Sequence, residues 1–414
     1  MIRRIQIDNF KSLVGFSLPP APNVLGKFTC LIGANGSGKT TVLQTIDFLS
    51  QLVKGRVPEW LRERNWSSQE LLSQLEVASG ECITITTEIQ LASTLPLTWK
   101  CTFSCVDSSV LEESIWENNQ CLLLAKDGWV SFTLSDREKQ LKNSGLRFSG
   151  SALSILADED LHPSLCLLKR SFSGYVANFE LVSTINLKQD SYPSREIGPR
   201  GENLPGFLHE ISDGIRQRVY TVMREFFPNV GGLQREIKKD DLVRLSIFEK
   251  NMRVLLPTGS ALSNGISSRH FSDGFTRILA IVAQVESSAT PGDVNAPDRI
   301  LLLDEIENGV HPETMAKLVQ YLATAPVQVI ATTHSPLILN DLTDAQAGES
   351  VIVLYRNSAG RTRSYRYFDL PSAKRKLGIL GPGEVYVDTS IEQIAREAEE
   401  MERGTSQATG APAQ

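Results

Sequence analysis

Residues 33–40 read GANGSGKT and contain the residue types that hold phosphate groups. The spacing of Gly33, Gly38, Lys39 and Thr40 matches the pattern G-x-x-x-x-G-K-[ST]. Glycines let backbone N–H groups turn inward around phosphates, while the lysine neutralises the β- and γ-phosphates and the threonine hydroxyl ligates Mg²⁺. The apolar stretch FTCLI precedes the loop and a helical pattern follows it, so a helix N-terminus adds positive charge. The pattern therefore predicts a nucleotide phosphate loop rather than a chance glycine-rich turn.

Two carboxylates stand at the end of another apolar stretch, RILLLDEIE. Asp304 is placed there to hold Mg²⁺, usually through water, and Glu305 to polarise an attacking water. The alternative is a buried strand with a solvated acidic exit. A further apolar stretch, QVIATTHSP, ends in a polar cluster where His334 is placed to contact a γ-phosphate. Because ligands of open α/β sheets bind at the carboxyl ends of the strands, we expect these side chains to converge there.

A Ser-Asp-Gly turn occurs far downstream of the phosphate loop, in FSDGFTRIL at residues 271–279. A serine hydroxyl and glycine N–H groups at a helix N-terminus can form a second anion site. The alternative is a plain helix N-cap, because Ser and Asp are preferred at that position. Taken alone, the turn favours the N-cap.

The composition is that of an ordinary soluble globular protein, with 41% hydrophobic and 22% charged residues among 414. The net charge of -6 excludes a global basic field of the kind that drives nucleic-acid binding. We find no apolar run near the roughly 20 residues that a membrane helix needs, and the start, MIRRIQIDNF, reads as a strand rather than a secretory signal. Six cysteines without a CxxC pair, with Cys101 and Cys105 expected as buried thiols, indicate a reduced, cytoplasmic protein.

The elements that must position these residues follow from the periodicity of the apolar side chains. RRIQIDNF alternates as a half-buried strand does, and CITITTEIQL, LTWKCTFSCV and GWVSFTL indicate an antiparallel sheet. The pattern turns helical from about Ser151 to Val182, and DLVRLSIFEK with MRVLLP reads as a strand pair. Continuous apolar strands that alternate with helices predict a parallel sheet covered on both faces.

With these motifs in this order, the chain resembles the ABC-type ATPases of the group that contains the RecF, SMC and OLD (overcoming lysogenisation defect) proteins, often labelled AAA family ATPases. The resemblance runs from Ile2 to about Tyr355. It implies that ATP and Mg²⁺ are bound, with Glu305 and His334 as the catalytic and switch residues and with Thr40 and Asp304 as metal ligands. NFKS resembles the first-strand motif of the family. The implied nucleotide-binding residues are Gly33, Ala34, Asn35, Gly36, Ser37, Gly38, Lys39, Thr40, Thr41, Lys11, Ser12, Ser272, Asp273 and Gly274.

In this family the triplet Ser272–Gly274 takes the place of the ABC signature, and we call it the signature triplet. It precedes the acidic strand by about 30 residues, as in the family, and this position favours the functional interpretation over the N-cap. The resemblance implies a head-to-tail homodimer in which each signature triplet caps the ATP bound by the partner copy. Hydrolysis would then open the dimer.

The implied fold is an α/β P-loop NTPase of ABC type, with a parallel core sheet, an N-terminal antiparallel β lobe and a helical signature lobe. The expected ATPase domain spans residues 1–355, divided into an N-terminal lobe (1–135), a helical insert region (136–270) and the signature-to-histidine region (271–355). A C-terminal extension (356–400) and a disordered tail (401–414) follow. Two departures from the family stand out: the Q-loop glutamine has only Gln51 and Gln90 as candidates, and the short insert excludes a long SMC-type coiled coil.

We consider three candidate biological roles for the ATPase. The first is a switch in DNA maintenance or phage defence. It draws on a basic segment near the C-terminus that could contact phosphate, with Arg361, Arg363, Arg366, Lys374, Arg375 and Lys376. The second is an ATP-sensing regulatory subunit of a separately encoded nuclease or toxin effector. The third, an OLD-like nuclease, is disfavoured because the roughly 80 residues after His334 show no Glu…Asp-x-Asp constellation.

Overall fold

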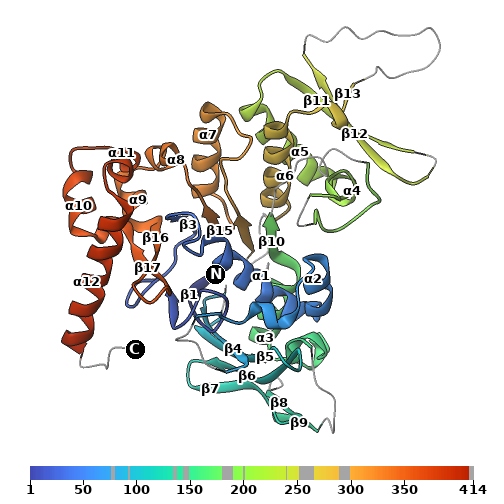
Figure 1. The fold of residues 1–414 in the computed structure, drawn as a ribbon. Helices are drawn as coiled ribbons and strands as arrows, with labels where there is room; N and C mark the ends of the chain where they lie inside the picture. The colour runs from blue at the N-terminus through green and yellow to red at the C-terminus, as the bar shows by residue number, and fades with distance from the viewer. Residues whose placement is uncertain are drawn as a thin grey trace, which may run out of the picture. The chain divides into compact units, whose positions relative to one another are not determined.

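The structure is a computed structural model, and it describes residues 1–75, 80–91, 94–133, 138–142, 149–179, 190–198, 201–238, 240–250, 265–288 and 299–409. The chain divides into two compact units, which are described one at a time. The first unit comprises Met1–Val176, Gly292–Leu301 and Gln328–Gln414, and the second comprises Ala177–Pro291 and Leu302–Val327. Figure 1 labels their helices and strands.

An eight-stranded antiparallel sheet forms one part of the first unit, in the order β2-β1-β4-β5-β6-β7-β8-β9. Its strands are β1 (Ile2–Asp8), β2 (Phe16–Leu18), β4 (Cys82–Ile89), β5 (Leu97–Ser104), β6 (Ser109–Glu117), β7 (Gln120–Lys126), β8 (Trp129–Thr133) and β9 (Glu138–Lys142). Every second residue of β4 is buried, because successive side chains of a strand point to opposite faces. The predicted N-terminal antiparallel lobe is confirmed.

A six-stranded sheet has the order β10-β14-β15-β3-β16-β17. Its strands are β3 (Phe28–Ile32), β10 (Val176–Phe179), β14 (Ile300–Leu303), β15 (Gln328–Thr332), β16 (Val351–Arg356) and β17 (Thr362–Arg366). Strand β3 pairs in parallel with both β15 and β16, and β17 adds an antiparallel edge. All residues of β3, β14 and β15 are buried, as expected for parallel strands covered on both faces. The predicted parallel core is confirmed.

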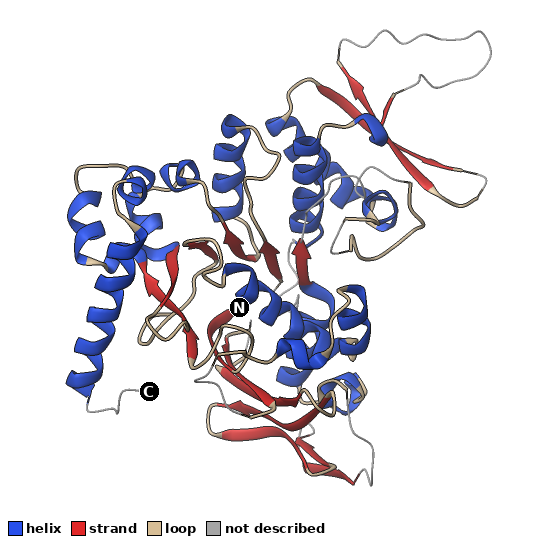
Figure 2. Cartoon of the chain, viewed as in Figure 1, coloured by secondary structure: helices blue, strands red, loops and turns tan. Residues whose placement is uncertain are grey.

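The helices of the first unit include α1, which begins directly after the phosphate loop and ends at Gly55 in the left-handed conformation. They are α1 (Lys39–Lys54), α2 (Val57–Glu63), α3 (Pro163–Tyr175), α8 (Pro336–Asn340), α9 (Asp344–Ser350), α10 (Pro371–Leu377), α11 (Pro382–Val387) and α12 (Ile391–Thr409). Short 3-10 helices span Ser68–Leu71, Ala152–Ser154, Asp158–Asp160 and Tyr367–Asp369. Figure 2 shows the same view with helices, strands and loops in separate colours.

The second unit combines helices with a small antiparallel sheet in the order β11-β12-β13. Its elements are α4 (Leu204–Glu210), α5 (Asp213–Phe226), β11 (Val230–Ile237), β12 (Val243–Glu249), β13 (Ile266–Ser267), a 3-10 helix (Ser268–His270), α6 (Asp273–Ser288) and α7 (Pro312–Ala323). Glu286 of α6 joins two neighbouring helices, because it accepts from Arg218 of α5 at 3.2 Å and from Tyr321 of α7 at 2.8 Å.

Two sequence predictions differ from the structure. The helical pattern expected up to Val182 ends at Tyr175, where β10 follows. Helix α12 packs against β16 and continues to Thr409, where the sequence predicts disorder from residue 401. The strand expected in DLVRLSIFEK is β12, which pairs with β11 and β13, while its expected partner MRVLLP lies outside the described residues.

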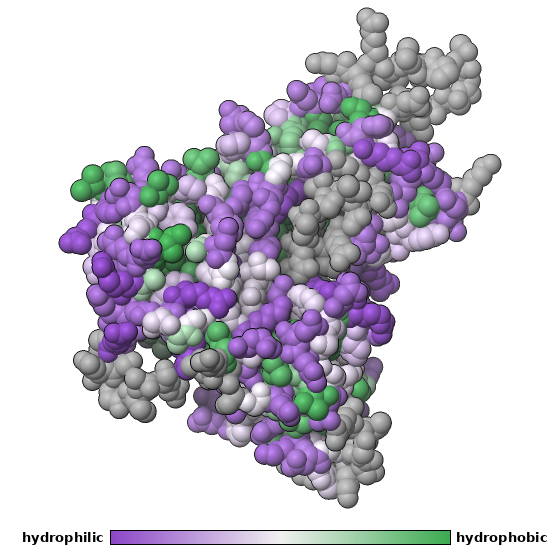
Figure 3. All heavy atoms as spheres, viewed as in Figure 1, coloured by the Kyte–Doolittle hydropathy of each residue, from purple (hydrophilic) through white to green (hydrophobic). Residues whose placement is uncertain are grey.

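Other expectations agree with the structure. Cys101 and Cys105 are buried free thiols, and burial raises the pKa of Cys105 to about 12. Within the part of the chain that the structure describes, we find no helix of the length and apolarity that crossing a membrane requires. On the face that Figure 3 shows, hydrophobic side chains gather in small separate groups among hydrophilic ones.

Candidate functional site

The phosphate loop, Gly33–Thr41, joins β3 to α1 and depends on two glycines. Gly33 has φ 141°, and a Cβ there would lie 2.1 Å from the carbonyl oxygen of Leu354. Gly38 has φ 105°, and a Cβ there would lie 2.7 Å from Oγ1 of Thr362. Because the conformation and the close approach both exclude a side chain, only glycine fits at these two positions.

Lys39 lies over the loop that it follows. Its Nζ donates to the carbonyl oxygens of Gly33 at 2.9 Å and Ala34 at 3.0 Å, and the residue is only 5% exposed. The ammonium is therefore held at the concave side of the loop, where it would neutralise a phosphate. Thr40, exposed in the first turn of α1, presents its hydroxyl at the positive end of a 16-residue helix.

These observations fit the phosphates of a nucleotide with Mg²⁺. Among the described residues we find no group of three or more His, Cys, Asp or Glu side chains that could hold a metal ion. Magnesium does not need such a group, because it is commonly bound by one or two protein ligands together with substrate phosphates and water. Thr40 and Asp304 stay predicted ligands of that kind.

The sequence did not reveal what supports the loop from behind. Oγ1 of Thr362, the first residue of β17, lies 2.8 Å from Oγ of Ser12 and 2.9 Å from the carbonyl oxygen of Ser37. Arg356 donates to the carbonyl oxygen of Gly36 at 2.9 Å. No pattern within the loop points to residues more than 300 positions away, since only the parallel pairing of β16 with β3 brings them together.

The first-strand residues Lys11 and Ser12 have different surroundings. Ser12 is buried beside the phosphate loop, because a Cβ on Gly38 would lie 3.2 Å from its Oγ. Lys11 donates to Gln44 at 2.9 Å and lies over the ring of Trp66, with its Nζ 3.6 Å from the ring centroid. Ser12 is thus brought to the back of the loop, and the ammonium of Lys11 is bound to α1 and an aromatic ring.

The two Q-loop candidates both make local bonds. Gln51 donates to Asp47 within α1 at 3.0 Å. Gln90 donates to the carbonyl oxygens of Leu91 and Thr94 at 3.2 and 2.8 Å. These contacts give neither residue a catalytic assignment.

His334 is exposed two residues beyond the end of β15. Thr332 of β15 is in register with Leu31 of β3, and the N–H of Thr333 donates to the carbonyl oxygen of Leu31 at 3.1 Å. The parallel pairing therefore brings the loop after β15 to the same sheet edge as the phosphate loop. This is the edge at which the sequence placed His334.

In the second unit, the signature triplet begins α6. Oγ of Ser272 accepts from the N–H of Phe275 at 3.3 Å, so this serine caps the helix. Ser272 and Asp273 are exposed. Gly274 lies against the backbone, because a Cβ there would stand 2.6 Å from the carbonyl oxygen of Gly309. The glycine is thus required by the close approach of a second loop, a reason that the sequence did not supply.

That second loop, Asp304–Val310, follows β14 and carries both acidic candidates; we call it the acidic loop. Glu305 has φ 47°, a left-handed conformation that is uncommon for a non-glycine residue. The N–H of Asn308 donates to the carbonyl oxygen of Glu305 at 3.0 Å, and the Asn308 amide also donates to the Glu305 carboxylate. The signature triplet and the acidic loop are therefore in direct contact within one unit.

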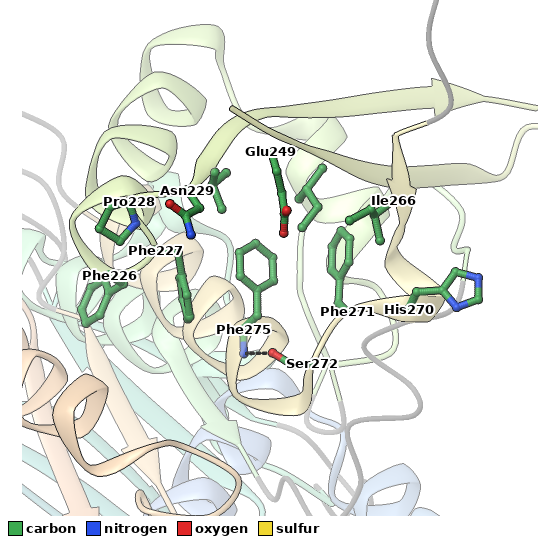
Figure 4. A pocket seen from close by; sticks show the side chains of 12 residues that line it. Phe226, Phe227, Pro228, Asn229, Glu249, Ile266, His270, Phe271, Ser272 and Phe275 are labelled. Atoms are coloured by element: carbon green, nitrogen blue, oxygen red, sulfur yellow. Dashed lines mark hydrogen bonds between the residues drawn. The ribbon is translucent and has the colours of Figure 1, made fainter. Parts of the chain in front are cut away.

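An aromatic pocket of about 370 Å³ borders the signature triplet (Figure 4). Phe275 lies between Phe227 and Phe271, with ring centroids 4.9 and 5.0 Å away, and Ser272 forms part of the rim. No sequence pattern pointed to this pocket. The rings fix the first turn of α6 against α5 and the small sheet.

The basic C-terminal segment does not present one continuous charged face. Arg363 donates to the carbonyl oxygens of Val14 and Gly15, Arg366 donates to that of Val24, and Arg361 is half-buried. Lys376 forms an ion pair with Asp388 at 2.9 Å. Lys374 and Arg375 are the exposed cations of the six.

The chain combines a glycine-dependent phosphate loop after a parallel strand with a capped helix that contacts an acidic loop. This arrangement is that of the ABC-type P-loop fold. The family model described as "AAA ATPase domain" matches residues 1–142, and that described as "AAA domain, putative AbiEii toxin, Type IV TA system" matches residues 223–340. Both matched models describe ATPase domains, and together with the SMC-head fold they support an ABC-type AAA family ATPase of the group that contains the RecF, SMC and OLD proteins.

Individual relatives agree with this class. An OLD nuclease of Thermus scotoductus is 43% identical over 49 residues, which span 12% of this chain and 8% of that protein. The match thus covers far less than two thirds of the nuclease. A crystal structure of an Smc head bound to the C-winged helix domain of ScpA has a TM-score of 0.54 at 12% identity, covering 88% of this chain and 96% of that one. The Smc head from Pyrococcus furiosus with an extended coiled coil, also bound to a ScpA domain, has a TM-score of 0.50 at 11% identity, covering 88% and 95%.

Proposed function

We propose that this chain binds ATP with Mg²⁺ at the phosphate loop and hydrolyses it in a site completed by a second copy of the chain. The cofactors are ATP and Mg²⁺, and the product phosphate leaves after water attacks the γ-phosphate. The observation that carries the proposal is the buried Lys39 ammonium held over a loop in which Gly33 and Gly38 exclude any side chain.

Each site residue has a role in this proposal. Backbone N–H groups of the loop cradle the phosphates, while Lys39 neutralises their charge. Thr40 and Asp304 hold Mg²⁺, and Glu305 polarises the attacking water. His334 contacts the γ-phosphate and responds to its loss.

The proposal of a head-to-tail homodimer rests on the signature triplet. Ser272 and Asp273 are exposed at the N-terminus of a 16-residue helix, whose positive end attracts an anion. One phosphate loop and one signature triplet from each copy would together form two complete sites in a dimer. ATP would bridge the copies, and hydrolysis would release them.

The catalytic assignment is tested with Glu305→Gln. Removing a general base is expected to lower kcat by about 10²- to 10⁴-fold. ATP binding should persist, and a dimer stable in ATP should accumulate, as measured by size-exclusion chromatography with light scattering. Normal hydrolysis by this variant would refute the role of Glu305.

The matched control for binding is Lys39→Ala. Loss of a charged hydrogen-bonding partner for the phosphates should weaken ATP binding by about 1.5–3 kcal/mol, roughly 10- to 150-fold. Ser272→Arg should instead leave ATP binding to the isolated chain intact and abolish both hydrolysis and ATP-dependent dimerisation. Normal turnover by the Ser272 variant would exclude the two-copy site.

For the biological role we propose an ATP-driven switch in DNA maintenance or phage defence. Lys374 and Arg375 are the exposed cations that could contact phosphate. DNA should then stimulate the ATPase, with a strong dependence on salt. A double Lys374→Glu, Arg375→Glu variant should lose the stimulation and keep the basal rate.

A second candidate role is an ATP-sensing regulatory subunit of a separately encoded nuclease or toxin effector. Two observations favour it: solved Smc heads of this fold are bound to a domain of another protein, ScpA, and one matched family model is described as a putative toxin of a toxin–antitoxin system. A pull-down with and without ATP, compared with Glu305→Gln, distinguishes the roles. An ATP-dependent protein partner without DNA stimulation supports the regulatory subunit.

A further inference from the structure

Arg277 is a buried charged residue that the proposed mechanism does not use. It lies in α6, one turn beyond the signature triplet, and is only 1% exposed. Arginine is rarely buried unless its charge and donors are satisfied by partners. The position of its partners therefore indicates what the side chain does.

The three hydrogen bonds of the Arg277 side chain all go to the acidic loop. Nη2 donates to the carbonyl oxygens of Asp304 at 2.8 Å and Glu305 at 2.7 Å, and Nη1 donates to that of Asn308 at 3.1 Å. The planar guanidinium presents these donors in a fixed geometry. One side chain therefore fixes the backbone of the loop at three points.

The backbone at the centre of this contact needs such support. Glu305 has φ 47°, which is costly for a residue with a side chain, and such conformations persist only where the surroundings determine them. Arg277 holds the carbonyl of Glu305 itself, while Asn308 binds both its backbone and its carboxylate. Hydrogen bonds from Arg277 and Asn308 therefore fix the orientation of the Glu305 carboxylate.

The arginine remains a cation under physiological conditions. Burial lowers its pKa to about 10, while the neighbouring carboxylates of Glu307, Asp304 and Glu305 oppose that shift. At neutral pH the guanidinium is fully protonated, so its hydrogen bonds to the carbonyls are charge-assisted.

We infer that Arg277 is a positioning residue for ATP hydrolysis, which ties the signature helix to the backbone of Glu305. The contact of Gly274 with Gly309 adds a second attachment between the same two segments. A displacement of the signature triplet by a partner's nucleotide would then be passed to the catalytic carboxylate. This inference rests on the proposed function.

The test replaces Arg277 by Lys, which keeps the charge but loses the planar fork. We expect kcat to fall about 10- to 100-fold, the loss typical when a catalytic group is displaced by about 1 Å. The Kd for ATP should stay within about twofold of wild type, since ordinary distant substitutions change free energies by only a few tenths of a kcal/mol. Arg277→Met should lose more kcat than Arg277→Lys, again with unchanged ATP binding.

Arg216 supplies a matched control in the same unit. It lies in α5 and donates to three backbone carbonyls, those of Leu208, His209 and Ile211, which are remote in sequence from the acidic loop. Arg216→Lys therefore removes the same kind of fork and tests a merely structural role. We expect it to lower the melting temperature as much as Arg277→Lys does, with kcat close to wild type.

The outcomes separate this inference from the proposed function. If Glu305→Gln is inactive but Arg277→Lys keeps wild-type kcat, the positioning role is refuted and the ATPase assignment stands. Equal kcat losses in Arg277→Lys and Arg216→Lys would also refute it, because the effect would then be one of stability. If Glu305→Gln hydrolyses ATP normally, the proposed catalytic role of Glu305 is refuted, and the positioning role of Arg277 is refuted with it. Should Arg277→Met not fold, Arg277→Lys alone carries the test.

Discussion

Replacing Gly274 by Ala probes the contact between the signature helix and the acidic loop. The new Cβ would lie 2.6 Å from the carbonyl oxygen of Gly309, whereas real Cβ contacts essentially never fall below 3.0 Å. The gap must therefore open by at least 0.4 Å, the difference between these two distances. The nearest atoms belong to the backbone of Gly309 and Val310, so a side-chain rotation cannot relieve the clash.

Two opposing effects set the size of the change. Alanine is favoured over glycine within a helix by up to about 1 kcal/mol. Overpacking in a well-packed region costs about 1–3 kcal/mol. The strain should win, and we expect Gly274→Ala to unfold at lower denaturant concentration by the equivalent of about 1 kcal/mol. The displaced acidic loop should also lower kcat.

Gly214 provides a control within the same sequence context. It is the second residue of α5, as Gly274 is the second residue of α6, and each follows a Ser-Asp pair. An added Cβ at Gly214 meets nothing within 4 Å. Gly214→Ala should therefore stabilise the chain by about 0.4–1 kcal/mol, since it only restricts the unfolded state.

The assay is urea denaturation without nucleotide, followed by steady-state ATPase measurements. Omitting nucleotide matters because Gly274 is also proposed to offer its N–H to a partner's phosphate, and only the packing effect remains without ATP. Opposite shifts of the two variants are expected. The reasoning is refuted if Gly274→Ala is as stable as Gly214→Ala and has the wild-type kcat.

Three further predictions follow from single contacts. Gly33→Ala should abolish ATP binding in a titration of a fluorescent nucleotide, because its Cβ would stand 2.1 Å from the Leu354 carbonyl. Thr362→Val removes a buried hydroxyl that bonds the Ser37 carbonyl and should lower unfolding free energy by about 1–3 kcal/mol, measured in urea. Burial raises the pKa of Glu113 above 4.5, so the native state holds this proton to higher pH than the unfolded state and stability falls as pH rises from about 4.5 through the raised value. Glu113→Gln should flatten that part of the stability-versus-pH curve, and an unchanged slope would contradict the prediction.

The sequence predicted the parts of the fold that depend on local periodicity. The bounds of β3 coincide with FTCLI, and the alternation in RRIQIDNF and CITITTEIQL matches β1 and β4. A buried apolar run or a period of two is readable because burial acts on each side chain in turn. The helical expectation up to Val182 was wrong for residues 176–179, where the pairing of β10 in the sheet determines the conformation.

The candidate site was predictable only as far as its chemistry is encoded in neighbouring residues. Gly33, Gly38 and Lys39 form one motif, in which the two glycines have positive φ and the ammonium of Lys39 donates to the loop. Phosphate binding by these residues stays a prediction. Thr362 and Arg277 carry no local signal, because each acts on a loop that is distant in sequence. Such residues become visible only when strand pairing and helix packing bring the two segments together.

The two Ser-Asp-Gly triplets show this limit within a single chain. Ser212 and Ser272 both cap a helix, accepting from the N–H three residues on at 3.4 and 3.3 Å. In both helices an arginine in the first or second turn donates to backbone carbonyls. The two triplets therefore have the same residues and nearly the same local hydrogen bonds, and an N-cap explains both triplets equally well. What differs is the tertiary neighbour: open space faces Gly214, whereas the carbonyl of Gly309 in the acidic loop faces Gly274. If the second triplet is the one that acts in ATP hydrolysis, its function comes from the loop that it contacts, and the sequence of the triplet alone could not have distinguished it from the first.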